Sequence, residues 1–146
     1  MIQAKSTLTT LVMLGVVLLS LSPTSQACPW SVSGGWVRFV STSSMGGAYA
    51  QFENLGNKPV SITSIISPAF GSIESHQSVL SDGKMQMQPY QIQLEPHAKL
   101  MFEPKGKHLM LFDPVKPLSL KSHLSIRFTD NTGCVVSGDF EVREII

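Results

Sequence analysis

Near its C-terminus the chain reads LSLKSHLSIRFT (residues 118–129), DNTG (130–133) and CVVSGDFEVR (134–143). In the first of these segments, Leu124, Ile126 and Phe128 alternate with polar residues, which is the two-residue period of a strand with one buried face. The tetrapeptide DNTG has the composition of a turn. The third segment returns with valines and phenylalanine, residues that favour strands. The stretch therefore predicts an antiparallel hairpin.

The preceding part of the chain shows the same short apolar segments. The chain contains nine prolines and eleven glycines, and these separate the segments at close intervals. After residue 27 no apolar pattern with a 3.6-residue period reaches the length of a helix. We therefore predict an all-β sandwich of seven to nine short strands. The candidate extended segments from which these strands are expected, besides the hairpin, cover residues 36–40, 48–54, 60–66, 72–76, 85–88, 92–94, 99–102 and 108–112.

The N-terminus has the pattern of a signal peptide. Lys5 precedes an uncharged apolar run at residues 8–21, which is too short for a membrane span. The small residues Ser25 and Ala27 then match a cleavage site after Ala27. We expect a signal peptide at residues 1–27, export to the periplasm, and one mature domain at residues 28–146 with no membrane span. The alternatives are an uncleaved N-terminal anchor and a lipid-modified Cys28, against which Ser25 stands where a lipoprotein signal has leucine.

Charge and cysteine content limit the possible partners. Without Lys5 the mature chain has ten Lys and Arg residues and ten Asp and Glu residues, because the whole chain has 11 and 10. Such a balance gives no basic surface excess for nucleic acid or anionic lipid, so no nucleic-acid partner is expected. The two cysteines, Cys28 and Cys134, are expected to form a disulfide in an oxidising compartment.

Methionines and histidines form the most informative pattern. His76 and the pair Met85/Met87 precede His108 and Met110. Residues two apart on a strand project from the same face, about 6.6 Å apart, so His108 and Met110 can converge on one ion. Thioether sulfur is soft and neutral, and together with imidazole it favours copper(I) over hard ions. Methionine also avoids the disulfide formation that would remove a thiol ligand.

Most methionines in proteins serve as apolar packing residues, and lone histidines are usually surface residues. We accordingly interpret Met45 and Met101 as packing or loop residues. His97 and His123 are interpreted as solvated polar positions. Trp30, Trp36 and Phe39 are expected in the core rather than in a binding platform.

These residues resemble the motif of the periplasmic PCuAC copper chaperones. That motif is a histidine, ten residues, a methionine, about twenty-one residues, and then His-x-Met. Ten residues separate His76 from Met87, and twenty, one fewer than usual, separate Met87 from His108. Further similarities occur at Gly35-Trp36-Val37-Arg38, Gly47-Ala48-Tyr49, Glu53-Asn54-Leu55-Gly56, Ser67-Pro68-Ala69 and Asp82-Gly83.

The resemblance implies a cupredoxin-like Greek-key sandwich that holds one copper(I) ion. It implies a ligand set consisting of His76, Met87, His108 and Met110. Met85 lies off the motif position and is expected to be an apolar support or an auxiliary ligand. The implied acceptor is a cytochrome c oxidase subunit or one of its assembly factors. Cys28 and Cys134 have no counterpart in the family motif.

Other functions fit the residues less well. A blue-copper carrier needs a histidine soon after its cysteine ligand, and none follows Cys134. The chain also lacks the Gly-x-Ser-x-Gly and His-Glu-x-x-His motifs of hydrolases, so we do not expect an enzyme. Two alternatives stay open, namely a protein that sequesters copper in metal tolerance and a structural or interaction sandwich without metal.

Overall fold

The computed structural model describes residues 27–146. Its ten strands are β1 (Trp30–Val40), β2 (Met45–Asn54), β3 (Val60–Ile66), β4 (Phe70–Ser81), β5 (Lys84–Pro89), β6 (Gln93–Leu94), β7 (Lys99–Met101), β8 (Lys107–Pro114), β9 (His123–Asp130) and β10 (Val135–Ile145). One 3-10 turn, Ser41–Ser43, joins β1 to β2. The predicted signal peptide lies outside the described residues except for Ala27.

The predicted all-β class is confirmed, with more strands than the seven to nine expected. The two shortest, β6 and β7, contain two and three residues. No helix within residues 27–146 has the length and apolar character needed to cross a membrane.

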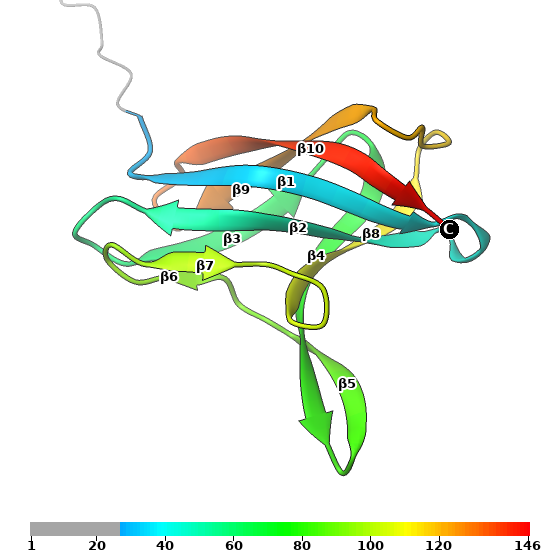
Figure 1. The fold of residues 1–146 in the computed structure, drawn as a ribbon. Coiled ribbons are helices and arrows are strands. Elements are labelled where there is room, and N and C mark those ends of the chain that lie inside the picture. Colours follow the sequence, from blue (N-terminus) through cyan, green and yellow to red (C-terminus); the bar gives the residue numbers. More distant parts are fainter. Residues whose placement is uncertain (1–26) are drawn as a thin grey trace, which may run out of the picture.

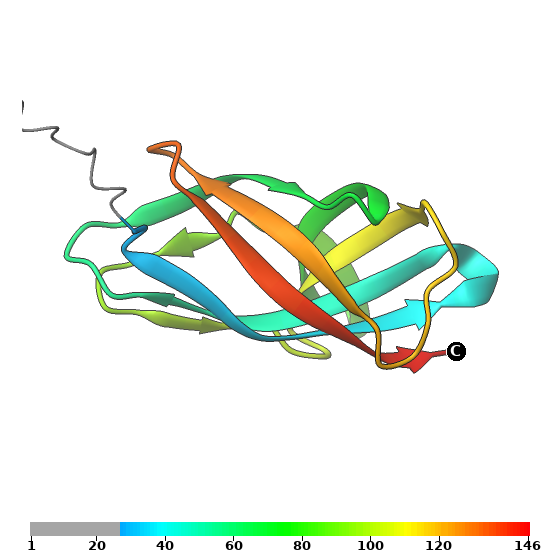
Figure 2. The same ribbon diagram turned by 90° about the horizontal axis from the view of Figure 1, so that it is seen from above.

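All ten strands belong to one hydrogen-bonded sheet that folds over on itself. The strand order is β5-β4-β8-β2-β1-β10-β9-β3-β6, and β7 pairs with β2 outside this path. β1 and β10 pair in parallel although they are the first and last of the described strands. In the view from above, the β9–β10 hairpin crosses obliquely over β4 and β8 (Figures 1 and 2). The fold thus has two layers with the core between them.

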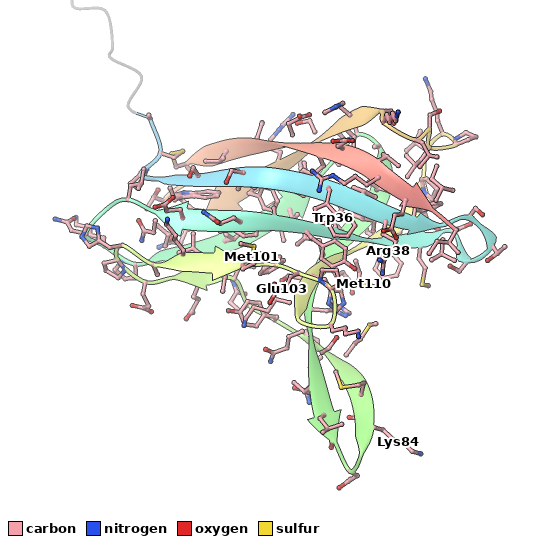
Figure 3. The ribbon with its side chains drawn as sticks, viewed as in Figure 1. Trp36, Arg38, Lys84, Met101, Glu103 and Met110 are labelled. Atoms are coloured by element: carbon pink, nitrogen blue, oxygen red, sulfur yellow. A yellow bond between two sulfur atoms is a disulfide. The ribbon has the colours of Figure 1, made fainter. Side chains whose placement is uncertain are left out.

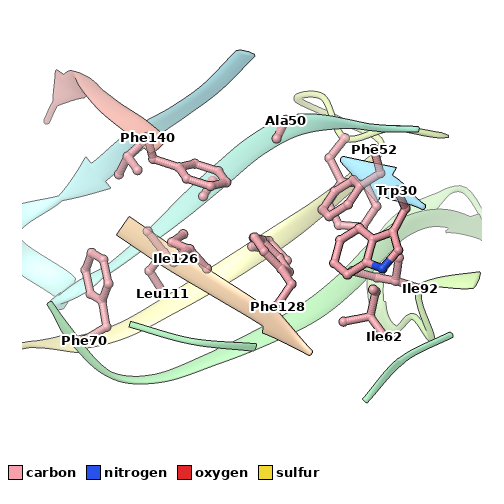
Figure 4. Packing of buried hydrophobic residues seen from close by; sticks show 14 of the residues in the cluster. Trp30, Ala50, Phe52, Ile62, Phe70, Ile92, Leu111, Ile126, Phe128 and Phe140 are labelled. Atoms are coloured by element: carbon pink, nitrogen blue, oxygen red, sulfur yellow. The ribbon is translucent and has the colours of Figure 1, made fainter. Parts of the chain in front are cut away.

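Side chains from both layers meet in the core (Figure 4). The ring of Phe52 on β2 lies 5.3 Å from that of Phe128 on β9, in an edge-to-face arrangement. Phe52 also contacts Phe102, at a centroid distance of 5.0 Å. Edge-to-face aromatic pairs at these distances add to the hydrophobic stabilisation of the burial itself. Trp30 and Phe39, as expected from the sequence, are buried in this core, whereas Trp36 is only partly buried.

The predicted C-terminal hairpin is present, but its first strand begins later than expected. β9 starts at His123, because residues 118–122 follow Pro117 and include Lys121 at a φ of 62°. Such a φ is incompatible with an extended strand. The N–H of Lys121 donates to the carbonyl of Val142, which holds this connection against β10.

The β4–β5 hairpin projects away from the sandwich (Figure 1). Ser81 pairs with Lys84, so Asp82 and Gly83 form a two-residue loop, and both have positive φ (49° and 73°). This is the conformation of a type I′ turn, which matches the twist of the flanking strands. Because β4 continues to Ser81, His76 lies within a strand. The sequence-based placement of His76 at a strand end is therefore wrong.

The predicted disulfide between Cys28 and Cys134 is present, with the two Cα atoms 5.8 Å apart. It links the segment before β1 to the start of β10 across 106 residues of sequence. A bridge that closes a long loop typically stabilises a domain by about 2–4 kcal/mol.

Candidate metal centre

β8 presents different side chains to its two faces. Leu109 and Leu111 are fully buried in the core, so the alternation of the strand directs His108 and Met110 to the opposite face. In the adjacent strand β4, His76 pairs directly with His108 and Glu74 pairs with Met110. The four side chains therefore share one face of the sheet.

The β4–β5 hairpin adds Met87 to this face. Met87 pairs with Ser78, two residues beyond His76 on β4. A cavity of about 260 Å³ lies between the hairpin, β8 and β2. Its lining includes Met87, His108 and Met110 together with Ser78, Arg38, Val40, Ser43, Met45, Gly46, Gly47, Tyr49 and Lys105. Three of the four predicted ligands are thus brought to one cavity. Figure 3 shows Met110 and Arg38 on this side of β2, with Lys84 at the far end of the hairpin.

His108 is held with one ring nitrogen unpaired. The residue is 4% exposed, and its Nδ1 lies 3.0 Å from the carbonyl oxygen of Gly106. A carbonyl only accepts, so Nδ1 carries the proton and Nε2 keeps its lone pair. Nε2 is buried and has no hydrogen-bond partner among the described residues. A buried imidazole nitrogen with an available lone pair is suited to bind a metal ion.

His76 lies beside His108 but does not line the same cavity. The two ring centroids are 6.1 Å apart. Nε2 of His76 lies 2.9 Å from Oε2 of Glu74, whereas its Nδ1 is buried and has no partner among the described residues. His76 and Glu74 line a neighbouring cavity of about 410 Å³. An ion bound to one nitrogen of each ring at a typical distance of about 2 Å would separate the centroids by about 5–6 Å, depending on the angle between the two bonds.

The remaining methionines differ in their positions. Met85 pairs with Leu80 nearer the tip of the hairpin and is not among the residues that line the 260 Å³ cavity. Met101 lies on β7, opposite Gln51, and is half exposed and also outside this cavity. Met45, interpreted from the sequence as a packing or loop residue, instead lines the cavity from β2.

The sequence did not indicate Met45 as a residue of this cavity, because its distance from Met110 depends on the register between β2 and β8. Met45 pairs with Phe112, and Gly47 pairs with Met110, so Met45 is the diagonal neighbour of Met110 on the same face. Gly47 has no side chain to separate them, and a Cβ there would lie 2.8 Å from the hydroxyl of Tyr49. Burial raises the pKa of Tyr49, with a smaller opposing effect from Arg38, so this wall presents a neutral hydroxyl.

The donor atoms on this face are imidazole nitrogens and thioether sulfurs. Within residues 27–146, His, Cys, Asp and Glu side chains do not gather in groups of three or more that could hold an ion. Two imidazoles with two or more thioethers form a soft, neutral donor set of the kind preferred by copper(I). The lining of the 260 Å³ cavity includes two cationic side chains, Arg38 and Lys105, and no carboxylate of the described residues.

The chain matches the LpqE-like family and two curated relatives. The sequence model of the family, described as "Putative lipoprotein LpqE-like", matches residues 30–142. The chain is 32% identical over 102 residues to the uncharacterized protein RP573 of Rickettsia prowazekii, an alignment that spans 67% of this chain but only 55% of that protein. It is 28% identical over 115 residues to Lxx21020 of Leifsonia xyli, covering 76% and 69% of the two chains.

Solved PCuAC domains share the fold. The apo PCuAC domain of PmoF1 superposes with a TM-score of 0.69 at 20% identity, covering 82% of this chain and 97% of that domain. The copper-bound PCuAC domain of PmoF2 gives 0.67 at 18% identity, covering 82% and 96%. CuI-DR1885 of Deinococcus radiodurans gives 0.63 at 22% identity, covering 82% of each chain. The resemblance to PCuAC domains predicted from the sequence is thus confirmed for the fold.

Proposed function

The chain belongs to the LpqE-like family, and from this membership and its candidate metal centre we propose that it is a copper(I) chaperone. In this proposal one copper(I) ion is the cargo, and its ligands are His76, Met87, His108 and Met110. Met85 serves as an apolar support or auxiliary ligand near the hairpin tip. The protein carries out no chemical conversion of its cargo.

The observation that carries the proposal is a pair of buried imidazole nitrogens that have no partner within residues 27–146. Nε2 of His108 and Nδ1 of His76 are both buried, and a buried polar atom left unpaired costs about 1–3 kcal/mol. Binding of a metal ion would remove this cost. The fold neighbours include a copper-bound PCuAC domain and a copper(I) form of DR1885, which supports the choice of ion.

Exposure of Met87 supports transfer rather than storage. Its side chain is 61% exposed on the projecting hairpin, whereas His108 is 4% exposed. An acceptor could therefore replace the Met87 thioether first, while the histidines still hold the ion. We propose a cytochrome c oxidase subunit or assembly factor as the acceptor. Loading of such an acceptor by the copper-bound chain, and not by a copper–chelator complex at the same free copper concentration, would distinguish delivery from sequestration.

We further propose that residues 1–27 direct export to the periplasm and that residues 28–146 form the functional domain. The disulfide supports an oxidising compartment. The name of the family, which refers to lipoproteins, also fits an exported protein.

Exchange of the two thioether ligands for leucine tests the site. Met87→Leu and Met110→Leu keep side-chain volume and apolarity, so stability should change by less than about 1.5 kcal/mol. Copper(I) affinity should nevertheless fall in both variants, because leucine offers no donor atom. Anaerobic competition with a chelator measures the affinity, and thermal unfolding measures the stability.

Met101→Leu is the matched control, because Met101 is also exposed but lies on β7 outside the cavity. Met45 is unsuitable as a control since its side chain lines the cavity. The ligand assignment fails if Met87→Leu and Met110→Leu bind copper(I) as tightly as the parent, or if Met101→Leu is equally damaging.

A further inference from the structure

We propose that Glu74 is a positioning residue that makes Nδ1 of His76 the nitrogen that binds copper(I). The inference rests on the proposed function and adds to it a residue outside the ligand set. It also assigns opposite ring nitrogens to the two histidines, Nδ1 for His76 and Nε2 for His108.

The contact between Glu74 and His76 determines which nitrogen carries the proton. Oε2 of Glu74 lies 2.9 Å from Nε2 of His76. A carboxylate can only accept, so the neutral imidazole places its proton on Nε2 and its lone pair on Nδ1. Glu74 thereby selects one tautomer of His76.

The selected nitrogen is also the one without a protein partner. Nδ1 of His76 is buried and makes no hydrogen bond to the described residues. The His76 side chain as a whole is only 17% exposed. A lone pair that is buried and unpaired at this position is available to a ligand from outside the chain, and Nε2 of the neighbouring His108 is also buried and without a partner among the described residues.

Strand geometry keeps Glu74 close to the site without making it a ligand. Glu74 and His76 are two residues apart on β4 and share a face, and Glu74 pairs directly with Met110 on β8. Its side chain remains 58% exposed. Copper(I) prefers sulfur and imidazole donors to carboxylate oxygen, so the carboxylate acts on the ion only through the His76 ring.

The ring of His108 is oriented by a main-chain hydrogen bond instead. Its Nδ1–H donates to the main-chain carbonyl of Gly106 at 3.0 Å. The main chain thus sets the tautomer of His108, whereas the side chain of Glu74 sets that of His76. Only the Glu74 contact can be removed by substitution without changing the loop at Gly106.

Nitrogen-15 NMR of the imidazole rings tests the proposal in the full exported chain. In the copper-free parent we expect His76 to be a single Nε2–H tautomer, and one equivalent of copper(I) should shift its Nδ1 resonance. Glu74→Leu removes the acceptor and should give a tautomer mixture in the copper-free protein. Its copper(I) affinity should fall about 10- to 100-fold, the usual effect of losing a partner of a metal-binding histidine.

Glu74→Gln should restore most of the affinity and the Nδ1 shift, because its amide oxygen can accept from Nε2–H. Glu95→Leu is the charge control. Glu95 is exposed and its side chain makes no hydrogen bond or ion pair in the described part of the chain. It should behave as the parent.

The proposal is overturned if copper(I) shifts Nε2 of His76 in the parent, or if Glu74→Leu keeps both the parent tautomer and the parent affinity. Shifts at His108, Met87 and Met110 without any at His76 would overturn this proposal and remove His76 from the ligand set, but would leave copper(I) binding by the other three residues intact. No shift at any of the four residues would overturn the proposed function as well.

Discussion

His108→Gln should lower copper(I) affinity by at least about 100-fold, the upper end of what loss of an outer-shell partner costs. His108 is the most buried of the four proposed ligands and lines the cavity, and its buried Nε2 has no partner among the described residues. Glutamine keeps a similar volume and can still donate to the carbonyl of Gly106, but it has no basic nitrogen for the ion. Anaerobic competition with a chelator of known affinity measures the loss.

The unfolding free energy of this variant should fall by about 1–3 kcal/mol, because a buried polar side chain is exchanged for one of different shape. His123→Gln is the control. His123 is exposed on β9, pairs with Asp139 and does not line the cavity, so its replacement should leave copper(I) affinity unchanged. Parent-like affinity in a folded His108→Gln protein would remove His108 from the ligand set.

Asp130→Ala should reduce the free energy of unfolding by about 3 kcal/mol. Asp130 is 3% exposed, and its Oδ2 accepts from Nε1–H of the buried Trp30 at 2.8 Å. Its Oδ1 accepts from the N–H and the hydroxyl of Thr132 and from the N–H of Cys134. Alanine leaves all these donors without their acceptor, next to the disulfide. Urea unfolding at neutral pH measures the change, and Asp139→Ala, at an exposed site, should cost under about 0.5 kcal/mol.

The Asp130 network also predicts a pH dependence. Burial alone would raise the pKa of Asp130, but the donors from Thr132, Trp30 and Cys134 outweigh it and hold the pKa below the ordinary value of 3.8. As the pH falls, the Asp130 carboxylate is therefore protonated at a lower pH in the folded state than in the unfolded state. Its stabilisation is present above about pH 4 and is lost as the pH falls through the lowered pKa. Between about pH 5 and about pH 2, on either side of the ordinary pKa, the free energy of unfolding should therefore fall less in Asp130→Ala than in the parent. An equal loss in both proteins would contradict this assignment.

Local patterns predicted most of the strands. The alternation of Leu124, Ile126 and Phe128 gave β9, and the turn residues Asp82 and Gly83 marked the projecting hairpin. The same local geometry placed His108 and Met110 on one face of β8. These features depend on residues within a few positions of one another, so the sequence contains the information directly.

Features set by strand register were not predictable in this way. Met45 reaches the cavity only because β2 pairs with β8, more than fifty residues further along the chain. Met87 pairs with Ser78 only because β4 continues beyond His76, and the sequence pattern ended that strand at His76. The Cys28–Cys134 pair was predictable because only two cysteines are present.

Titration of the purified, exported chain with copper(I) under anaerobic conditions, followed by NMR of the methionine methyl groups, tests the central claim most directly. We expect saturation at one equivalent of copper(I), with the methyl signals of Met87 and Met110 shifted and that of Met101 unchanged. Absence of uptake, or uptake that leaves Met87 and Met110 unshifted, would contradict a copper(I) site built from His76, Met87, His108 and Met110.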